Sequence, residues 1–214
     1  ITGSQLPLGA VGSDAQANLS LAISTAVRAR SSAPAAIAFG GALVPAVRAT
    51  KYQAEAHAAF RAERALGADP IGIPRSEALH EGRPADPARV VSFRFVPGAT
   101  ADDLRAAAST GPDGLVLECY GSGNGPMARP GMIDALREVS TRLPVVAITQ
   151  CSTGAVDLER YAVGRQLAAT GVIDGGDLTL EAALAKLAFG IDRGLSGPAL
   201  RALLVANLVG ERTP

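Results

Sequence analysis

Short runs of apolar residues alternate along the chain with longer segments whose apolar residues recur at helical spacing. The expected strands are residues 34–41, 90–96, 114–121 and 144–151. The expected helices are residues 13–29, 100–110, 130–142, 158–170, 179–193 and 197–208. Strands that alternate with helices in this way predict an α/β fold with a largely parallel sheet.

The first expected helix has two candidate N-caps, Ser13 and Asp14, whose side chains can accept hydrogen bonds from free backbone N–H groups. Its apolar residues fall on one face, as in an amphipathic helix. They are Leu19, Ala22, Ile23, Ala26 and Val27. Thr179 is the expected N-cap of the helix at residues 179–193. Residues 54–66, rich in alanine and charge, fit either a helix or a loop.

A polar segment at residues 75–89 contains two prolines and predicts a linker. It divides the chain into residues 1–89, which include the linker, and residues 90–214, a second α/β domain. The opening residues have the pattern of the tail of a buried strand, with no strand core before them. The sequence therefore predicts that the N-terminal domain is incomplete and that residue 1 lies in mid-domain.

The composition narrows the class of protein. The 214 residues are 48% hydrophobic and carry no formal net charge. A sizeable core is expected, whereas a nucleic-acid surface would need an excess of basic residues. Since no apolar run is long enough to span a bilayer, no membrane segment is expected either. The two cysteines, Cys119 and Cys151, are far apart and suit a reducing cytoplasm better than a disulfide scaffold.

Lysine is rare in this chain, since only Lys51 and Lys186 occur among 20 basic residues. A lysine can release its proton when it is partly buried, whereas arginine stays protonated. Lys51 is therefore a candidate base, although a solvated surface lysine is the more ordinary interpretation. The two histidines, His57 and His80, do not have the spacing of metal ligands, and no metal or other cofactor is expected.

A glycine-rich turn at residues 118–126 follows one of the expected strands. It meets the dinucleotide fingerprint only in part, because Pro126 stands where the third glycine belongs. Ligands of open α/β sheets bind beyond the carboxyl ends of the strands, where this turn lies. Polar residues that follow two strands could bind a small ligand or simply cap strands and helices. They are Asn124, Thr149, Gln150, Ser152 and Thr153.

Several segments together resemble the bacterial-type L-asparaginase family, most closely its cytoplasmic type I branch. They are TGSQLPLGAVGSDAQANLSLAI, RATK, YGSGNGP, TQCSTGAVDLERYAVGRQLAATGVIDGGDLTLEAALAKL and NLVGERTP, in this order. The resemblance implies a two-domain α/β amidohydrolase that converts L-asparagine to L-aspartate and ammonia. It also implies a cytoplasmic homodimer or homotetramer.

In that family the nucleophile is a threonine in a T-G-G-T-I motif, and a second threonine in a T-D-T motif joins it to a lysine. Lys51 in RATK matches that lysine by position. Neither threonine motif occurs in these 214 residues. The resemblance therefore implies that an N-terminal segment with the nucleophile is missing and that the fragment alone is inactive.

The resemblance also assigns substrate contacts. Ser4 matches the position whose backbone carbonyl faces the substrate amide, and Asn124 and Tyr161 lie in segments that approach the neighbouring subunit's site. Some type I enzymes bind asparagine as an effector, at positions that match Thr50, Asn124 and Cys151. The family's arginine beside them is replaced by Glu118. A carboxylate there would repel the effector carboxylate, so we expect no effector binding.

Two alternatives remain open. The chain is also compatible with the asparaginase-like subunit of a tRNA-dependent amidotransferase, although its neutral charge offers no tRNA surface. A third possibility is a catalytically dead dimerisation or interaction module.

Overall fold

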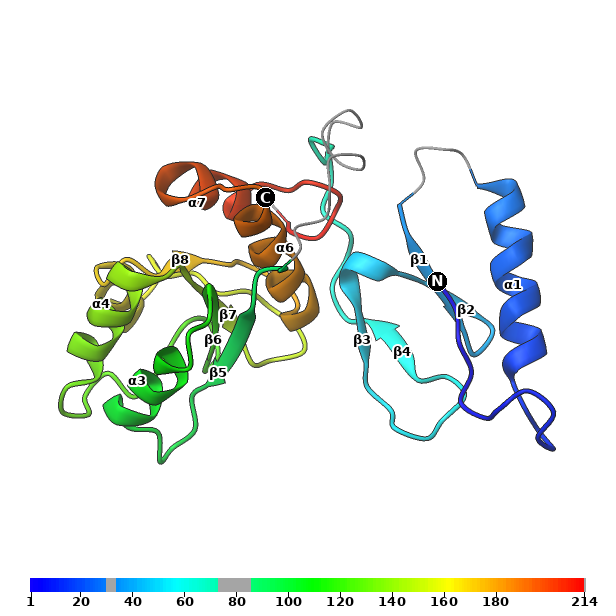
Figure 1. The fold of residues 1–214 in the computed structure, drawn as a ribbon, viewed down its shortest axis with the longest axis horizontal. Helices are drawn as coiled ribbons and strands as arrows, with labels where there is room; N and C mark the ends of the chain where they lie inside the picture. The colour runs from blue at the N-terminus through cyan, green and yellow to red at the C-terminus, as the bar shows by residue number, and fades with distance from the viewer. Residues whose placement is uncertain (30–33, 73–85, 214) are drawn as a thin grey trace. The chain divides into compact units, whose positions relative to one another are not determined.

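The computed structural model of the protein divides into two compact units, Ile1–Leu66 and Gly67–Pro214 (Figure 1). The structure describes residues 1–29, 34–72 and 86–213. The predicted linker at residues 75–89 lies largely outside the described residues, and so does His80.

The Gly67–Pro214 unit contains a four-stranded sheet in which each strand runs parallel to its neighbour. In spatial order the strands are β5 (Val90–Arg94), β6 (Gly114–Cys119), β7 (Val145–Thr149) and β8 (Ile173–Asp174). All residues of β6 and β7 are buried, as expected for central strands covered on both faces. The predicted α/β class with a parallel sheet is confirmed, whereas β8 was not predicted because two residues show no period.

Helices cover both faces of this sheet. They are α3 (Ala101–Ser109), α4 (Met132–Arg142), α5 (Ala162–Ala168), α6 (Leu180–Asp192) and α7 (Gly197–Val205). Residues of α3, α4 and α5 form one apolar cluster with the sheet, and residues of α6 and α7 form a second. Helices on both sides of the sheet make it the core of the unit.

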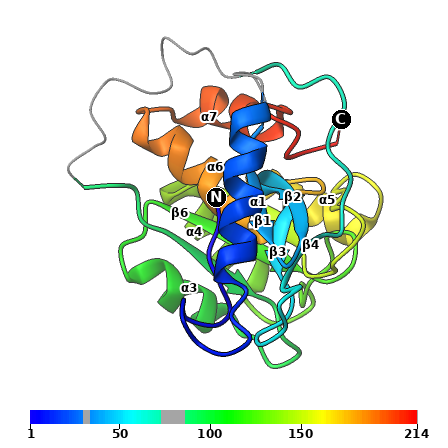
Figure 2. The same cartoon turned by 90° about the vertical axis from the view of Figure 1, so that its right-hand side faces the viewer.

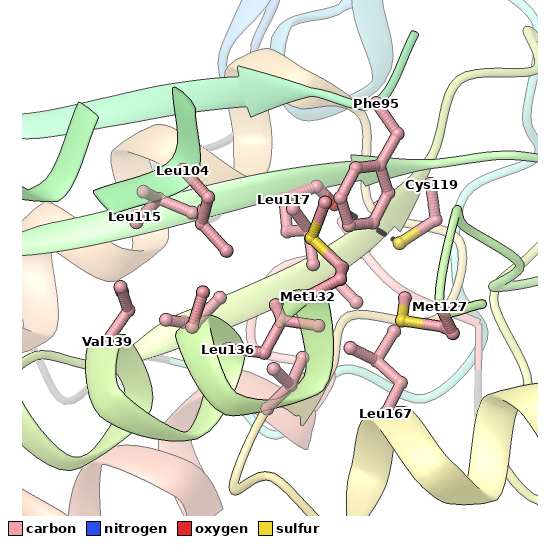
Figure 3. Packing of buried hydrophobic residues seen from close by; sticks show 14 of the residues in the cluster. Phe95, Leu104, Leu115, Leu117, Cys119, Met127, Met132, Leu136, Val139 and Leu167 are labelled. Atoms are coloured by element: carbon pink, nitrogen blue, oxygen red, sulfur yellow. Dashed lines mark hydrogen bonds between the residues drawn. The ribbon is translucent and has the colours of Figure 1, made fainter. Parts of the chain in front are cut away.

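The strand side chains alternate between these two clusters. Leu115 and Leu117 of β6 belong to the first cluster, while Val116 between them belongs to the second. Figure 3 shows Leu104 of α3 and Met132 and Leu136 of α4 gathered around the β6 leucines. Each fully buried leucine contributes about 1.5–3 kcal/mol by leaving water.

Side chains fix the starts of two of these helices. At α3, Thr100 and Asp103 form a capping box, in which the Asp103 N–H lies 3.2 Å from the Thr100 hydroxyl and the Thr100 N–H lies 2.9 Å from the Asp103 carboxylate. At α6, the Thr179 hydroxyl accepts a hydrogen bond of 3.1 Å from the Ala182 N–H, so the predicted cap is confirmed. Such caps satisfy N–H groups that the first helical turn leaves free.

The Ile1–Leu66 unit pairs its strands antiparallel, β1 with β2 and β3 with β4. Its elements are α1 (Ala15–Arg28), β1 (Ala36–Phe39), β2 (Ala42–Pro45), the 3₁₀ turn η1 (Ala46–Arg48), β3 (Ala49–Lys51) and β4 (Phe60–Ala62). Helix α1 runs beside β1 (Figures 1 and 2). Gly40 and Gly41 make the β1–β2 turn with φ angles of 58° and 78°, which glycine adopts without strain.

The first residues of the chain lie beside β1 and run parallel to it. The Ile1 amino group donates to the Ala36 carbonyl at 2.9 Å, and the Ala38 N–H donates to the Ile1 carbonyl at 2.9 Å. Thr2 and Ala38 form an isolated parallel bridge. These bonds hold the opening residues beside β1, although Ile1 is 77% exposed and not buried as a strand core would be.

Two expectations for this unit need correction. Of the apolar face predicted for α1, Leu19, Ile23 and Val27 are 52%, 56% and 81% exposed, while the buried residue is Asn18. The helix turns this polar residue inward because the Asn18 amide hydrogen-bonds backbone groups of the unit. Residues 54–66 contain the short strand β4 within turns and no helix.

Candidate active site

Lys51 is the last residue of β3 and lies opposite Phe60 of β4. Its side chain is exposed, and Nζ lies 3.4 Å from the Gln5 Oε1 atom. A proton-transferring lysine was expected to be partly buried, and the described residues do not bury Lys51. Thr50, the residue before it, lies opposite Arg61 and is half-buried.

Ser4 is exposed and directly precedes a segment that Asp14 holds in place. The Asp14 carboxylate accepts the N–H groups of Gln5 at 2.9 Å and Leu6 at 3.1 Å. Burial alone would raise the pKa of Asp14, but hydrogen bonds from these N–H groups and from Asn18 outweigh it and lower the pKa. Of the two candidate caps of α1, Asp14 occupies the N-cap position but its side chain makes no cap hydrogen bond, whereas the Ser13 hydroxyl accepts the Ala15 N–H at 3.2 Å.

A cavity of about 440 Å³ lies at the carboxyl end of β6 and contains both Asn124 and Tyr161. It is lined by residues 120–124, Asp157 and residues 161–164. Tyr161 is 55% exposed, and the Arg160 guanidinium lies 5.4 Å from the centre of its ring. Two predicted substrate contacts therefore share one pocket of the Gly67–Pro214 unit, beyond a strand end as expected.

The turn that carries Asn124 is held closed by its backbone. Tyr120 and Asn124 each donate an N–H to the other's carbonyl at 2.8 Å. The Asn124 side-chain oxygen accepts the Gly125 N–H at 2.8 Å, so the side chain itself helps shape the turn. Gly123 has a φ of 112°, and a Cβ atom there would lie 3.0 Å from Leu158 Cδ2 and 3.1 Å from Val156 Cγ1. Glycine at this position lets the turn pack against residues 156–158.

Glu118, which the resemblance sets at the position of an arginine, is 5% exposed on β6 and lies opposite Arg94 of β5. Glu118 Oε2 lies 2.6 Å from Arg94 Nη2 and 2.9 Å from Arg94 Nε. The arginine side chain is 55% exposed, so the cation faces solvent and covers the carboxylate. This pair was not predicted from the sequence. The spacing of the two residues does not reveal that their strands are neighbours or which residues lie opposite each other.

The end of β7 carries the remaining candidates. The Gln150 side-chain amide donates to the carbonyl oxygens of Phe95 at 2.7 Å and Glu118 at 2.8 Å, and so ties three strand ends together. Cys151 is exposed, and its N–H donates to the Thr149 hydroxyl at 3.1 Å. Cys119 is fully buried, and burial raises the pKa of its thiol to about 12.

The predicted site residues thus form two groups. Glu118, Asn124, Cys151 and Tyr161 belong to the Gly67–Pro214 unit and lie at or beyond the carboxyl ends of its strands. Ser4, Thr50 and Lys51 belong to the Ile1–Leu66 unit. Within the residues that the structure describes, no cluster of His, Cys, Asp and Glu is suited to a metal ion. None of the described helices is long and apolar enough to cross a membrane.

Comparison with known proteins identifies the family. Residues 1–73 match the family model "Asparaginase, N-terminal" and residues 89–204 match "Glutaminase/Asparaginase C-terminal domain". The L-asparaginase of Thermococcus kodakarensis is 33% identical over 100% of this chain and 67% of its own length. Its solved structure superimposes with a TM-score of 0.80, at 32% identity and again over 67% of that chain.

Two further relatives refine this result. L-asparaginase 1 of Escherichia coli strain K12 is 33% identical over 100% of this chain and 66% of its own length. A glutamyl-tRNA(Gln) amidotransferase polypeptide of Aeropyrum pernix is also 33% identical, but over only 58% of this chain. The fold is thus that of the two-domain α/β asparaginases. The chain belongs to the asparaginase family and spans about two thirds of the length of these L-asparaginases.

Proposed function

We propose that the protein is an L-asparaginase, which hydrolyses the side-chain amide of L-asparagine to L-aspartate and ammonia. The observation that carries this proposal is the extent of the match, which covers 100% of the chain for L-asparaginases and 58% for the amidotransferase polypeptide. A dead interaction module is less well supported, because by the resemblance Lys51 matches the position of the family's catalytic lysine.

In the proposed mechanism a threonine hydroxyl from outside these 214 residues adds to the amide carbonyl of the substrate. Its proton passes through a second threonine to the Lys51 amine and then to the leaving nitrogen, which departs as ammonia. Water then attacks the acyl-enzyme ester, releasing aspartate and returning the proton to the threonine. Arginine could not replace Lys51 in this cycle, because its guanidinium does not give up a proton. The Ser4 backbone carbonyl would accept a hydrogen bond from the substrate amide.

The proposed assembly is a cytoplasmic homodimer or homotetramer. Asn124 and Tyr161 are proposed to approach the site of the neighbouring subunit. The exposure of Tyr161, at 55%, supports this role, since its ring is accessible to a partner.

An activity assay on the full-length gene product tests this proposal. Purified protein would be supplied with L-asparagine, with L-glutamine, or with glutamyl-tRNA and an amide donor, and ammonia and amidated tRNA would be measured. An asparaginase releases ammonia fastest from asparagine and needs no tRNA. Ammonia release that depends on glutamyl-tRNA would favour the amidotransferase, and no release from either amide would favour the dead module.

We predict that the whole enzyme is not activated cooperatively by asparagine. An effector carboxylate needs a cation, and at this position the Arg94 guanidinium is already engaged with Glu118. Cooperative activation requires an effector that binds one conformation better than another. The rate should therefore rise hyperbolically with asparagine concentration. A sigmoidal curve that becomes hyperbolic in Glu118→Ala would contradict this prediction and assign effector binding to Glu118.

A further inference from the structure

The Gln5 side chain links Lys51 to the loop between β3 and β4. Its Oε1 atom accepts a hydrogen bond from Lys51 Nζ at 3.4 Å, and its Nε2 atom donates to the Ala54 carbonyl. Gln5 is partly buried, whereas Lys51 and Ala54 are exposed. One amide therefore contacts both the lysine and the loop that leaves it, from a position 46 residues away from Lys51 in the chain.

The backbone that carries Gln5 is itself fixed by buried polar groups of α1. Asp14, 8% exposed, accepts the Gln5 N–H at 2.9 and 3.1 Å through its two oxygens. Asn18, 1% exposed, donates to Asp14 at 2.8 Å and to the Gly3 carbonyl at 3.0 Å. The Asn18 side-chain oxygen also accepts the Gly40 N–H at 2.9 Å. The first turn of α1 thus ties Gly3, Gln5 and the β1–β2 turn to one another.

We propose that Gln5 is a positioning residue for Lys51, held in place by Asp14 and Asn18. A contact of 3.4 Å orders an exposed lysine only if its partner is already fixed, because an ordered lysine loses up to about 2 kcal/mol of rotamer freedom. The buried Asp14–Asn18 pair supplies that fixed partner. The catalytic meaning of this arrangement rests on the proposed function, but the arrangement itself does not.

Glutamine suits this position because its amide accepts from Lys51 and donates to Ala54 at the same time. A leucine at position 5 would be similar in size to glutamine but would lose the hydrogen bonds to both Lys51 and Ala54. Glutamate would lose the bond to Ala54 and strengthen the contact with the ammonium group. The two variants therefore predict opposite effects on the order of the Lys51 side chain.

The experiment uses the rarity of lysine in this chain. With ¹³C-labelled lysine, the 214-residue protein gives one side-chain signal set for Lys51 and one for Lys186, which is buried and serves as the internal reference. We expect the Cε order parameter of Lys51 to fall in Gln5→Leu to that of a free lysine and to rise above the native value in Gln5→Glu. Lys186 should not change. Gln16→Leu, at an exposed glutamine of α1, is the matched control and should leave Lys51 as it is.

An unchanged Lys51 order parameter in folded Gln5→Leu would overturn the proposal, and so would a Lys51 as mobile as free lysine in the native protein. If Gln5→Leu does not fold, Gln5→Glu decides alone. The proposal is then contradicted if the Lys51 order parameter in Gln5→Glu is no higher than in Gln16→Leu.

In the whole gene product, Gln5→Leu should lower kcat about tenfold, with KM little changed. A fall in kcat without a change in Lys51 order would assign Gln5 another role. Because the NMR experiment needs no turnover, it stands even if the protein is not an asparaginase.

Discussion

The 214-residue chain on its own is expected to release no ammonia from L-asparagine. An acyl-enzyme mechanism needs a nucleophile, and the T-G-G-T-I and T-D-T motifs that carry the family's threonines are absent from this sequence. Lys51 alone, exposed at the end of β3, has no hydroxyl partner to activate in this scheme. A coupled ammonia assay on the purified chain, with a Lys51→Ala chain as control, measures the rate.

The two chains should give the same rate, indistinguishable from buffer. Ammonia release by the native chain above that of Lys51→Ala would contradict the prediction. It would mean that these residues contain a nucleophile that the resemblance does not identify.

Replacement of Lys186 by methionine is expected to destabilise the Gly67–Pro214 unit by about 3 kcal/mol, since removing one partner of a buried ion pair leaves the other charge uncompensated. Lys186 Nζ lies 2.6 Å from Glu211 Oε1, and the two side chains are 4% and 5% exposed. Lys186 also donates to the Ala206 carbonyl. The pair thus joins α6 to the segment after α7.

The Glu211 carboxylate also accepts the N–H groups of Leu208 at 3.0 Å and Val209 at 2.7 Å. Burial alone would raise the pKa of Glu211, but the bond from Lys186 and those two N–H groups outweigh it and lower the pKa below its ordinary 4.5. A carboxylate whose pKa is lowered by folding stabilises the folded state at any pH above its unfolded-state pKa. That stability is lost as the pH falls through the lower, folded-state pKa. The Lys186→Met effect should therefore shrink below pH 4.5.

Urea unfolding at neutral pH and in acid measures both effects. The methyl signals of Met127 and Met132, the two methionines of the chain, report on this unit alone. Lys51→Met is the matched control, since it removes an exposed lysine and should change the free energy of unfolding by less than about 0.5 kcal/mol. Equal midpoints for the two variants would show that the buried pair does not stabilise the unit.

The sequence predicted those parts of the fold whose signals are local. The strands β6 and β7 are mostly apolar, and α3 and α6 begin at threonine caps, so both kinds of element were recognised. Strands β2, β3, β4 and β8 were missed, because segments of two to four residues show no alternation. The inward face of α1 was missed because it is decided by Asn18, whose partners Gly3 and Gly40 lie outside the helix.

For the candidate site, too, local sequence signals were recognised and long-range contacts were not. Asn124 was predicted because it follows a strand end in a glycine-rich turn, and in the structure it lines a pocket together with Tyr161. Its role in a site stays a prediction. The Arg94–Glu118 and Gln5–Lys51 contacts join residues 24 and 46 positions apart. Strand register and the Asp14 anchor create them, and neither leaves a pattern in the sequence.

The most direct test of the account is turnover of the whole gene product after Lys51→Arg. Arginine keeps the positive charge and the length of the side chain but cannot release its proton. If Lys51 carries the proton between the threonine relay and the leaving nitrogen, kcat for L-asparagine should fall to background, while the circular dichroism spectrum and unfolding midpoint stay as in the native enzyme. Near-normal kcat in Lys51→Arg would contradict proton transfer by Lys51 and reduce this residue to an electrostatic role.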